Sequence, residues 1–79
     1  MFEYNICNQS DEQIFRDQCR AIEKHIPELI KSDLLVDVDG TLVQKYRHAK
    51  GLIVVKNDVQ VDALYVLADF DLLPYFSSD

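Results

Sequence analysis

Residues that interrupt regular structure are scarce in this sequence, which contains only two glycines and two prolines. Most of the chain must therefore lie in helices and strands, and long flexible linkers are excluded. A chain of 79 residues is too short for more than one domain, so we expect a single domain spanning residues 1–79. Hydrophobic residues make up 48% of the chain, which is typical of a folded protein and excludes an intrinsically disordered one.

Cysteine is equally scarce, and long hydrophobic runs are absent. Cys7 and Cys19 are the only cysteines, too few for the disulfide framework of a small secreted domain, and we expect both to be reduced thiols. No stretch approaches the roughly 20 apolar residues that span a bilayer, and the N-terminus lacks the basic and apolar regions of a signal peptide. These absences predict a soluble, cytoplasmic protein that binds no membrane.

Basic residues are outnumbered by acidic ones. The chain has 8 lysines and arginines against 14 aspartates and glutamates, for a net charge of −6. A nucleic-acid-binding domain needs a basic surface that attracts phosphates, so we expect no nucleic-acid partner. A negatively charged protein instead attracts a positively charged one, because opposite fields steer association. We therefore expect the partner to be a basic protein.

The first third of the sequence predicts a strand followed by a helix. Apolar residues alternate with polar ones over residues 2–6, which is the period of a half-buried strand. Ser10 and Gln13 have the spacing of a capping box, which predicts that a helix begins there, and Pro27 predicts its end near Ile26. Apolar residues three and four positions apart form one stripe along this helix, typical of packing on a core. The stripe consists of Phe15, Cys19, Ile22, Ile26 and Leu29.

The rest of the chain predicts antiparallel strands, because from residue 34 onward the hydrophobic period changes to two. Four strands are expected, over residues 34–38, 41–46, 52–56 and 59–68. Asp39-Gly40 and Asn57-Asp58 are typical of tight turns, and a two-residue turn at Asp39-Gly40 would place Val36 opposite Val43. The predicted fold class is α+β, with one N-terminal helix packed on a mostly antiparallel sheet of four to five strands in the order β-α-β-β-β-β.

The stretch LLVDVDGTLV, residues 34–43, resembles the nucleophile motif of the haloacid dehalogenase superfamily of phosphatases, an apolar strand followed by Asp-x-Asp-Gly-Thr. The resemblance implies that Asp37 is the nucleophile, that Asp39 is the general acid and base, and that a magnesium ion binds beside them. It also implies a parallel sheet flanked by helices. Fewer than half of the residues follow Thr41, and they alternate like meander strands without a helix between them. The residues themselves therefore favour an Asp-Gly hairpin.

Other catalytic patterns are absent from the sequence. His25 and His48 are the only histidines, and we expect them at surface or helix-cap positions. No Cys-x-x-Cys pair, glycine-rich phosphate loop or Ser-His-Asp order is present. We therefore expect a protein that is not an enzyme and that holds no cofactor and no metal.

Charge is unevenly distributed along the chain, since no lysine or arginine follows Lys56. The C-terminal third instead combines carboxylates with aromatic side chains. In a recognition surface for a basic protein, aromatic side chains act as anchors and carboxylates as steering and pairing groups. The residues predicted to bind the partner are Asp58, Asp62, Asp69, Phe70, Asp71, Tyr75 and Phe76. The alternative is a solvated acidic surface whose aromatic side chains lie in the core.

A small acidic protein with such a surface resembles, in physical character, the bacterial immunity proteins and antitoxins. The resemblance implies a non-catalytic inhibitor that neutralises a basic toxin, such as a nuclease, by placing carboxylates where the toxin would hold phosphates. A second expectation is a general protein-interaction or regulatory module that forms a homodimer through an exposed strand edge. A phosphatase using Asp37 and Asp39 is the third.

Overall fold

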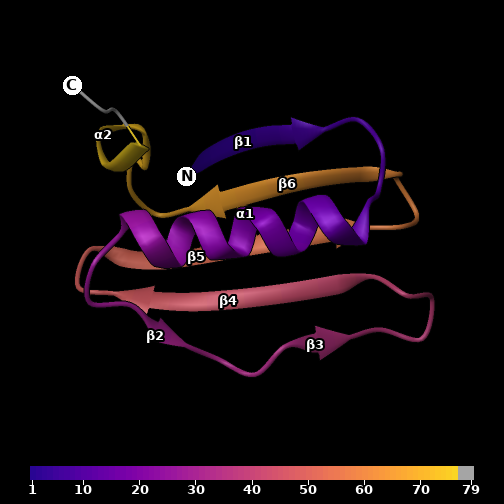
Figure 1. The fold of residues 1–79 in the computed structure, drawn as a ribbon, viewed down its shortest axis with the longest axis horizontal. Helices are drawn as coiled ribbons and strands as arrows, with labels where there is room; N and C mark the ends of the chain where they lie inside the picture. Colours follow the sequence, from indigo (N-terminus) through magenta and orange to yellow (C-terminus); the bar gives the residue numbers. More distant parts are fainter. Residues whose placement is uncertain (77–79) are drawn as a thin grey trace.

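The fold is an antiparallel sheet of six strands with one long helix on one face, as seen in the computed structural model, which describes residues 1–76 (Figure 1). The strands are β1 (Phe2–Cys7), β2 (Ile30–Lys31), β3 (Leu35–Val36), β4 (Leu42–His48), β5 (Gly51–Asp58) and β6 (Ala63–Ala68), and the helices are α1 (Glu12–His25) and the short α2 (Leu73–Phe76). The strands lie in the order β1-β6-β5-β4-β2, and β3 pairs with β4 on the same side as β2. The α+β class is confirmed, with slightly more strands than predicted because β2 precedes β3 along the same edge.

Helix α1 begins one residue later than the capping box predicted. Asp11 is the N-cap, and its Oδ1 accepts a hydrogen bond of 3.0 Å from the N–H of Ile14. The N–H of Ser10, the predicted cap, donates instead to Oδ1 of Asp62 at 2.8 Å. This bond joins segments that are distant in the sequence, so no local pattern indicated it. The end of the helix before Ile26 agrees with the prediction.

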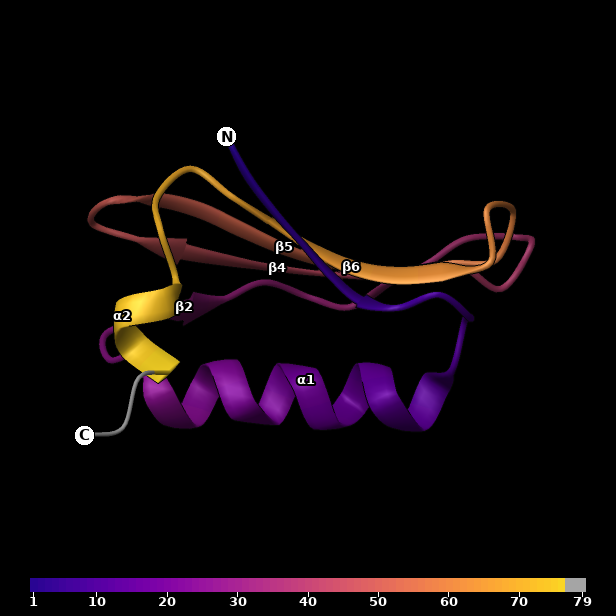
Figure 2. The same ribbon diagram turned by 90° about the horizontal axis from the view of Figure 1, so that it is seen from above.

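The core lies between α1 and one face of the sheet, and the other face of the sheet is open (Figure 2). The predicted apolar stripe supplies the helix side of this core, since Phe15, Cys19, Ile22 and Ile26 are all buried. A helix is about 10 Å wide and strands lie about 4.8 Å apart, so one helix covers the middle of such a sheet and leaves its edges. The segment that leads into α2 covers the β1 side, where Leu72 is buried. Within residues 1–76, no helix covers the β2–β3 side.

The hairpin between β3 and β4 has a three-residue loop, so the predicted two-residue turn is wrong. The N–H of Gly40 donates to the carbonyl of Asp37 at 3.0 Å, and Gly40 has a φ of 92°, as is typical of the residue that closes a loop of this size. The additional loop residue changes the register by one, so Leu35, and not Val36, lies opposite Val43. Because side chains alternate along a strand, Val36 and Val43 point to opposite faces of the sheet.

The second predicted turn, Asn57-Asp58, is also wrong, because both residues belong to β5. Asn57 is buried, and its Oδ1 accepts a hydrogen bond of 2.9 Å from the N–H of Asp11 at the start of α1. The chain turns at residues 59–62, and β6 begins only at Ala63. A tertiary hydrogen bond therefore overrides the local turn preference of asparagine.

Both cysteines are free thiols in the fold. Cys19 is buried on the helix stripe, and burial raises the pKa of its thiol, as expected for a structural rather than a reactive cysteine. No helix in the described part of the chain, residues 1–76, has the length and apolar character needed to cross a membrane.

Candidate protein-binding surfaces

Aromatic side chains near the C-terminal end gather around the turn between β4 and β5. The rings of His48 and Phe70 stack with centroids 5.0 Å apart, and the ring of Tyr75 lies edge-on to both, at 6.1 Å from each. Nζ of Lys50 lies 5.5 Å from the centroid of the Tyr75 ring, a cation–π contact. We call these four residues the C-terminal cluster. Because its rings pack on one another, Phe70 and Tyr75 are only half-exposed.

Asp69 and Asp71 hold the C-terminal cluster in place. Oδ2 of Asp69 accepts a hydrogen bond of 2.9 Å from the N–H of Leu52, and the N–H of Asp69 donates to the carbonyl of Leu52 at 3.0 Å. Oδ1 of Asp71 accepts from the hydroxyl of Tyr4 at 2.8 Å and from the N–H of Leu73 at 3.1 Å. Both carboxylates thus have partners within the protein. Both residues are nevertheless exposed, so an approaching protein still experiences their charge.

Asp58 and Asp62 lie at the opposite end of β6 from Asp69 and Asp71. The six residues of β6 separate the two pairs by roughly 20 Å. The structure therefore divides the predicted binding residues into two groups. Those at the C-terminal end are Asp69, Phe70, Asp71, Tyr75 and Phe76, and their role in binding remains a prediction, as does that of the other two.

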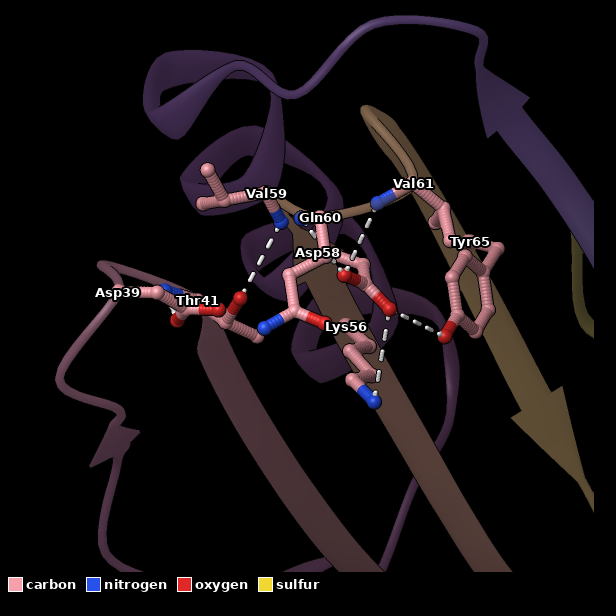
Figure 3. A network of polar contacts seen from close by, with 8 residues as sticks. All are labelled: Asp39, Thr41, Lys56, Asp58, Val59, Gln60, Val61 and Tyr65. Atoms are coloured by element: carbon pink, nitrogen blue, oxygen red, sulfur yellow. Dashed lines mark hydrogen bonds and ion pairs between the residues drawn. The ribbon is translucent and has the colours of Figure 1, made fainter.

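Asp58 organises the turn between β5 and β6 (Figure 3). Its Oδ1 accepts hydrogen bonds from the N–H groups of Gln60, at 3.0 Å, and Val61, at 3.4 Å. Its Oδ2 accepts from the hydroxyl of Tyr65 at 3.3 Å and lies 3.6 Å from Nζ of Lys56. Burial acts to raise the pKa of Asp58, but these donors and the Lys56 charge outweigh it, and the pKa lies below its ordinary value of 3.8.

The largest group of exposed apolar side chains lies on the outer edge of the sheet, in residues 30–40, which we call the edge segment. Every residue of the edge segment is exposed. Its large apolar side chains are Ile30, Leu34, Leu35, Val36 and Val38. Val36 is 65% exposed and Val38 is fully exposed. Leu34, Leu35, Val36 and Val38 are near neighbours in the sequence, and exposed apolar side chains grouped in this way are typical of a protein-binding site.

The turn between β5 and β6 extends this apolar surface. The N–H of Val59 donates to Oγ1 of Thr41 at 3.1 Å, which places the turn beside the hairpin loop of the edge segment (Figure 3). Val59 and Val61 are both exposed. The apolar surface therefore continues from β3 around the end of the sheet.

Carboxylates alternate with apolar side chains along the edge segment. Asp33, Asp37 and Asp39 lie in it, and no lysine or arginine lies between residues 32 and 40. The period of two over residues 34–38 places Leu34, Val36 and Val38 on one face of the predicted strand, as is typical of a half-buried strand. The structure exposes them because α1 does not extend over this edge, and the position of α1 is decided by the whole fold.

A groove of about 650 Å³ separates α1 from the edge segment. Its lining includes Phe15 and Glu23 on α1, and Lys31 and Leu34 on the other side. Beside the groove, the hydroxyl of the buried Tyr46 donates to Oε2 of Glu23 at 2.6 Å, and Nζ of Lys31 lies 3.0 Å from the same oxygen. Burial acts to raise the pKa of Glu23, but Tyr46 and Lys31 outweigh it and the pKa is lowered.

The residues that resemble a phosphatase motif form the loop of the β3–β4 hairpin. Oδ1 of Asp37 accepts a hydrogen bond of 2.7 Å from the N–H of Val38, and Oδ1 of Asp39 accepts one of 2.9 Å from the N–H of Thr41. The bond from Thr41 lowers the pKa of Asp39. Residues 1–76 do not form the parallel, helix-flanked sheet that the resemblance implied, because the strands on both sides of this loop pair in the antiparallel direction.

The two histidines lie in aromatic contacts. His48 belongs to the C-terminal cluster, and His25, the last residue of α1, packs on Phe76 with ring centroids 5.1 Å apart. Among residues 1–76, no three or more histidine, cysteine, aspartate or glutamate side chains are grouped so that they could hold a metal ion. No family model, no curated protein and no solved structure matches this chain.

Proposed function

We propose that this protein is a non-catalytic inhibitor of the immunity or antitoxin type, a cytoplasmic bacterial protein that neutralises a basic toxin, such as a nuclease, by covering its active site. One observation carries the proposal: the edge segment exposes large apolar side chains between carboxylates, on a chain of net charge −6. Removing these apolar side chains from water provides free energy of binding. The carboxylates favour a basic partner over a neutral or acidic one.

The acidic residues of the C-terminal end have a second role in this proposal. Asp69 and Asp71 are exposed, and no lysine or arginine follows Lys56 in the sequence. Their charge adds to the field that attracts a basic protein, and such fields act mainly on the rate of association. We therefore assign contact to the edge segment and steering to the C-terminal end.

The test is co-expression with the products of the adjacent reading frames. One of these products should be basic and should stop growth when it is expressed alone, and co-expression of this protein should restore colony formation. The purified pair should form an equimolar complex in which the toxic activity is lost. A toxic neighbour that this protein fails to neutralise, or a gene without any such neighbour, would contradict the proposal.

Variants with matched exposure locate the contact. Val36 and Leu73 are 65% and 62% exposed, so a lysine at either position should leave the fold intact. Val36→Lys should weaken binding of the toxic partner by roughly 100-fold, because it removes an apolar contact at the centre of the interface and adds a positive charge there. Leu73→Lys, on α2, is the control: it adds the same charge outside the proposed contact, so it should lower the affinity only a few-fold, through the association rate.

A further inference from the structure

We propose that the partner contributes an extended strand that pairs with the outer edge of β3, and that lysine or arginine residues alternate with apolar residues along this strand. The inference rests on the proposed function and specifies how the partner binds. It identifies the partner segment by its chemistry, as a basic and amphipathic β-strand.

The backbone of β3 has unused hydrogen-bonding groups on its outer side. The N–H of Asp37 donates to the carbonyl of Thr41 at 2.9 Å, inside the hairpin with β4. Along an antiparallel strand, successive residues direct their backbone N–H and carbonyl groups alternately to one neighbouring strand and to the other. The backbone groups of Leu35 and Asp37 therefore bond to β4, and the N–H and carbonyl of Val36 point away from it. In the part of the chain that the structure describes, no strand lies beyond β3. Such an edge is the site at which strand addition occurs.

The side chains of β3 specify the chemistry of the added strand. Leu35 lies opposite Val43, on the open face of the sheet, and Asp37 follows it by two residues on the same face. A strand paired with β3 would place alternate side chains beside this carboxylate, where lysine or arginine is favoured. Its other side chains would lie beside Leu34 and Val36, which are exposed and lie on the face of β3 that points toward α1, so apolar residues are favoured there.

The carboxylates also decide against a second copy of this protein as the occupant. Pairing β3 with β3 of another copy would bring Asp33, Asp37 and Asp39 of both copies together, and like charges on neighbouring strands are destabilising. Each copy also has a net charge of −6. Natural edge strands are often protected by lysine or proline, and residues 32–40 contain neither. Pairing of this edge with a second copy is therefore disfavoured by charge, whereas pairing with a basic strand is favoured.

A synthetic peptide tests this inference on the full chain. The probe is a capped peptide of alternating lysine and valine, and the control is the same peptide with glutamate in place of lysine. Titrated into the ¹⁵N-labelled protein, the lysine peptide should shift the amide signals of residues 34–38 in a saturable manner, more weakly at high salt. The glutamate peptide should produce no shifts. Shifts centred on β1, or equal binding of both peptides, would overturn the inference.

Two variants test the backbone and the charge separately. Val36→Pro removes an N–H that the sheet itself does not use, and it should weaken peptide binding about tenfold while the amide signals of β4 stay in place. Asp37→Asn keeps the oxygen that accepts from the N–H of Val38 and removes the charge, so it should weaken binding of the lysine peptide and reduce its salt dependence. Unchanged affinity in both variants would overturn the inference even if one of them folded poorly.

The outcomes for this inference and for the proposed function are distinguishable. Neutralisation of a toxic partner by the unmodified protein and equally by Val36→Pro would support the inhibitor function and reject strand addition. Saturable binding of the lysine peptide, without neutralisation of any neighbouring product, would support strand addition and reject the inhibitor function. A dimer in sedimentation, with concentration-dependent shifts at residues 34–38 in the absence of peptide, would assign the edge to a second copy and reject the inference.

Discussion

The hydroxyl of Tyr46 donates a hydrogen bond of 2.6 Å to Oε2 of Glu23, and this bond joins strand β4 to helix α1. Tyr46 has no solvent exposure, whereas Glu23 lies at the surface beside the groove and also pairs with Lys31. The contact therefore connects the core to the wall of the groove that separates α1 from the edge segment. It fixes the distance between α1 and the β2 side of the sheet.

Replacing Tyr46 with phenylalanine should destabilise the protein by about 1.5–3 kcal/mol, the typical contribution of a hydrogen bond to a charged group. Glu23→Gln is the control, because an amide oxygen can still accept from the hydroxyl, and it should cost less. Urea unfolding followed by circular dichroism measures both free energies of unfolding. A Tyr46→Phe protein as stable as the unmodified one would show that the bond makes no net contribution.

Gly51 should not tolerate alanine. A Cβ at this position would lie 2.5 Å from Cβ of Asp69, and the φ of 139° is unfavourable for any side chain. We expect Gly51→Ala to destabilise the protein by about 3 kcal/mol, through overpacking added to backbone strain. Gly40→Ala is the matched control: its φ of 92° causes strain, but its nearest neighbour lies 3.9 Å away. It should cost only about 1 kcal/mol, and thermal unfolding would rank the two.

Acid should destabilise the fold through Asp58 and Glu23. The folded state lowers the pKa of both below their ordinary values of 3.8 and 4.5. A lowered pKa means that the folded state binds fewer protons than the unfolded state, so this stability is present above the ordinary values and is lost as pH falls through the folded pKa. Urea midpoints measured from about pH 6 to about pH 2.5 should therefore fall most steeply below about pH 4.5. Asp58→Asn should flatten this profile; a profile identical to that of the unmodified protein would show that Asp58 is not responsible.

The double variant Asp69→Asn and Asp71→Asn should separate steering from contact. Asparagine retains the oxygens that accept from Leu52, Tyr4 and Leu73, so the fold should persist while two charges are removed. We expect the association rate with a basic partner to fall a few-fold at low salt and the dissociation rate to stay constant. Stopped-flow binding measures both rates. A raised dissociation rate would place Asp69 and Asp71 in the contact surface, as the sequence alone predicted.

Local patterns predicted the elements of this fold well where the responsible contacts are close in the sequence. The apolar stripe from Phe15 to Ile26 depends only on the period of a helix, and its burial was predicted correctly. Two of the failures involve bonds between distant segments. Asn57 remains in a strand because Asp11 donates to it, and Asp11 replaces Ser10 as the cap while Ser10 donates to Asp62.

The candidate binding surface was predicted less well, for a geometric reason. The predicted binding residues near the C-terminus are close in the sequence. The full length of β6 nevertheless separates Asp58 and Asp62 from the predicted binding residues that follow this strand. The exposed apolar edge was not predicted, because Leu34, Val36 and Val38 have the alternation of a buried strand. Alternation indicates which residues share a face, and it does not indicate whether another element covers that face.

The sequence by itself determined the fold class, the helix and its core face, and the antiparallel hairpin at Asp39-Gly40, because periodicity, proline and glycine act over a few residues. Only the tertiary structure decided the register of that hairpin and the exposure of the edge segment. A loop of three residues rather than two sends Val36 to the face opposite Val43. One helix is narrower than this sheet, so the packing of α1 over its middle leaves the β3 edge exposed (Figure 1).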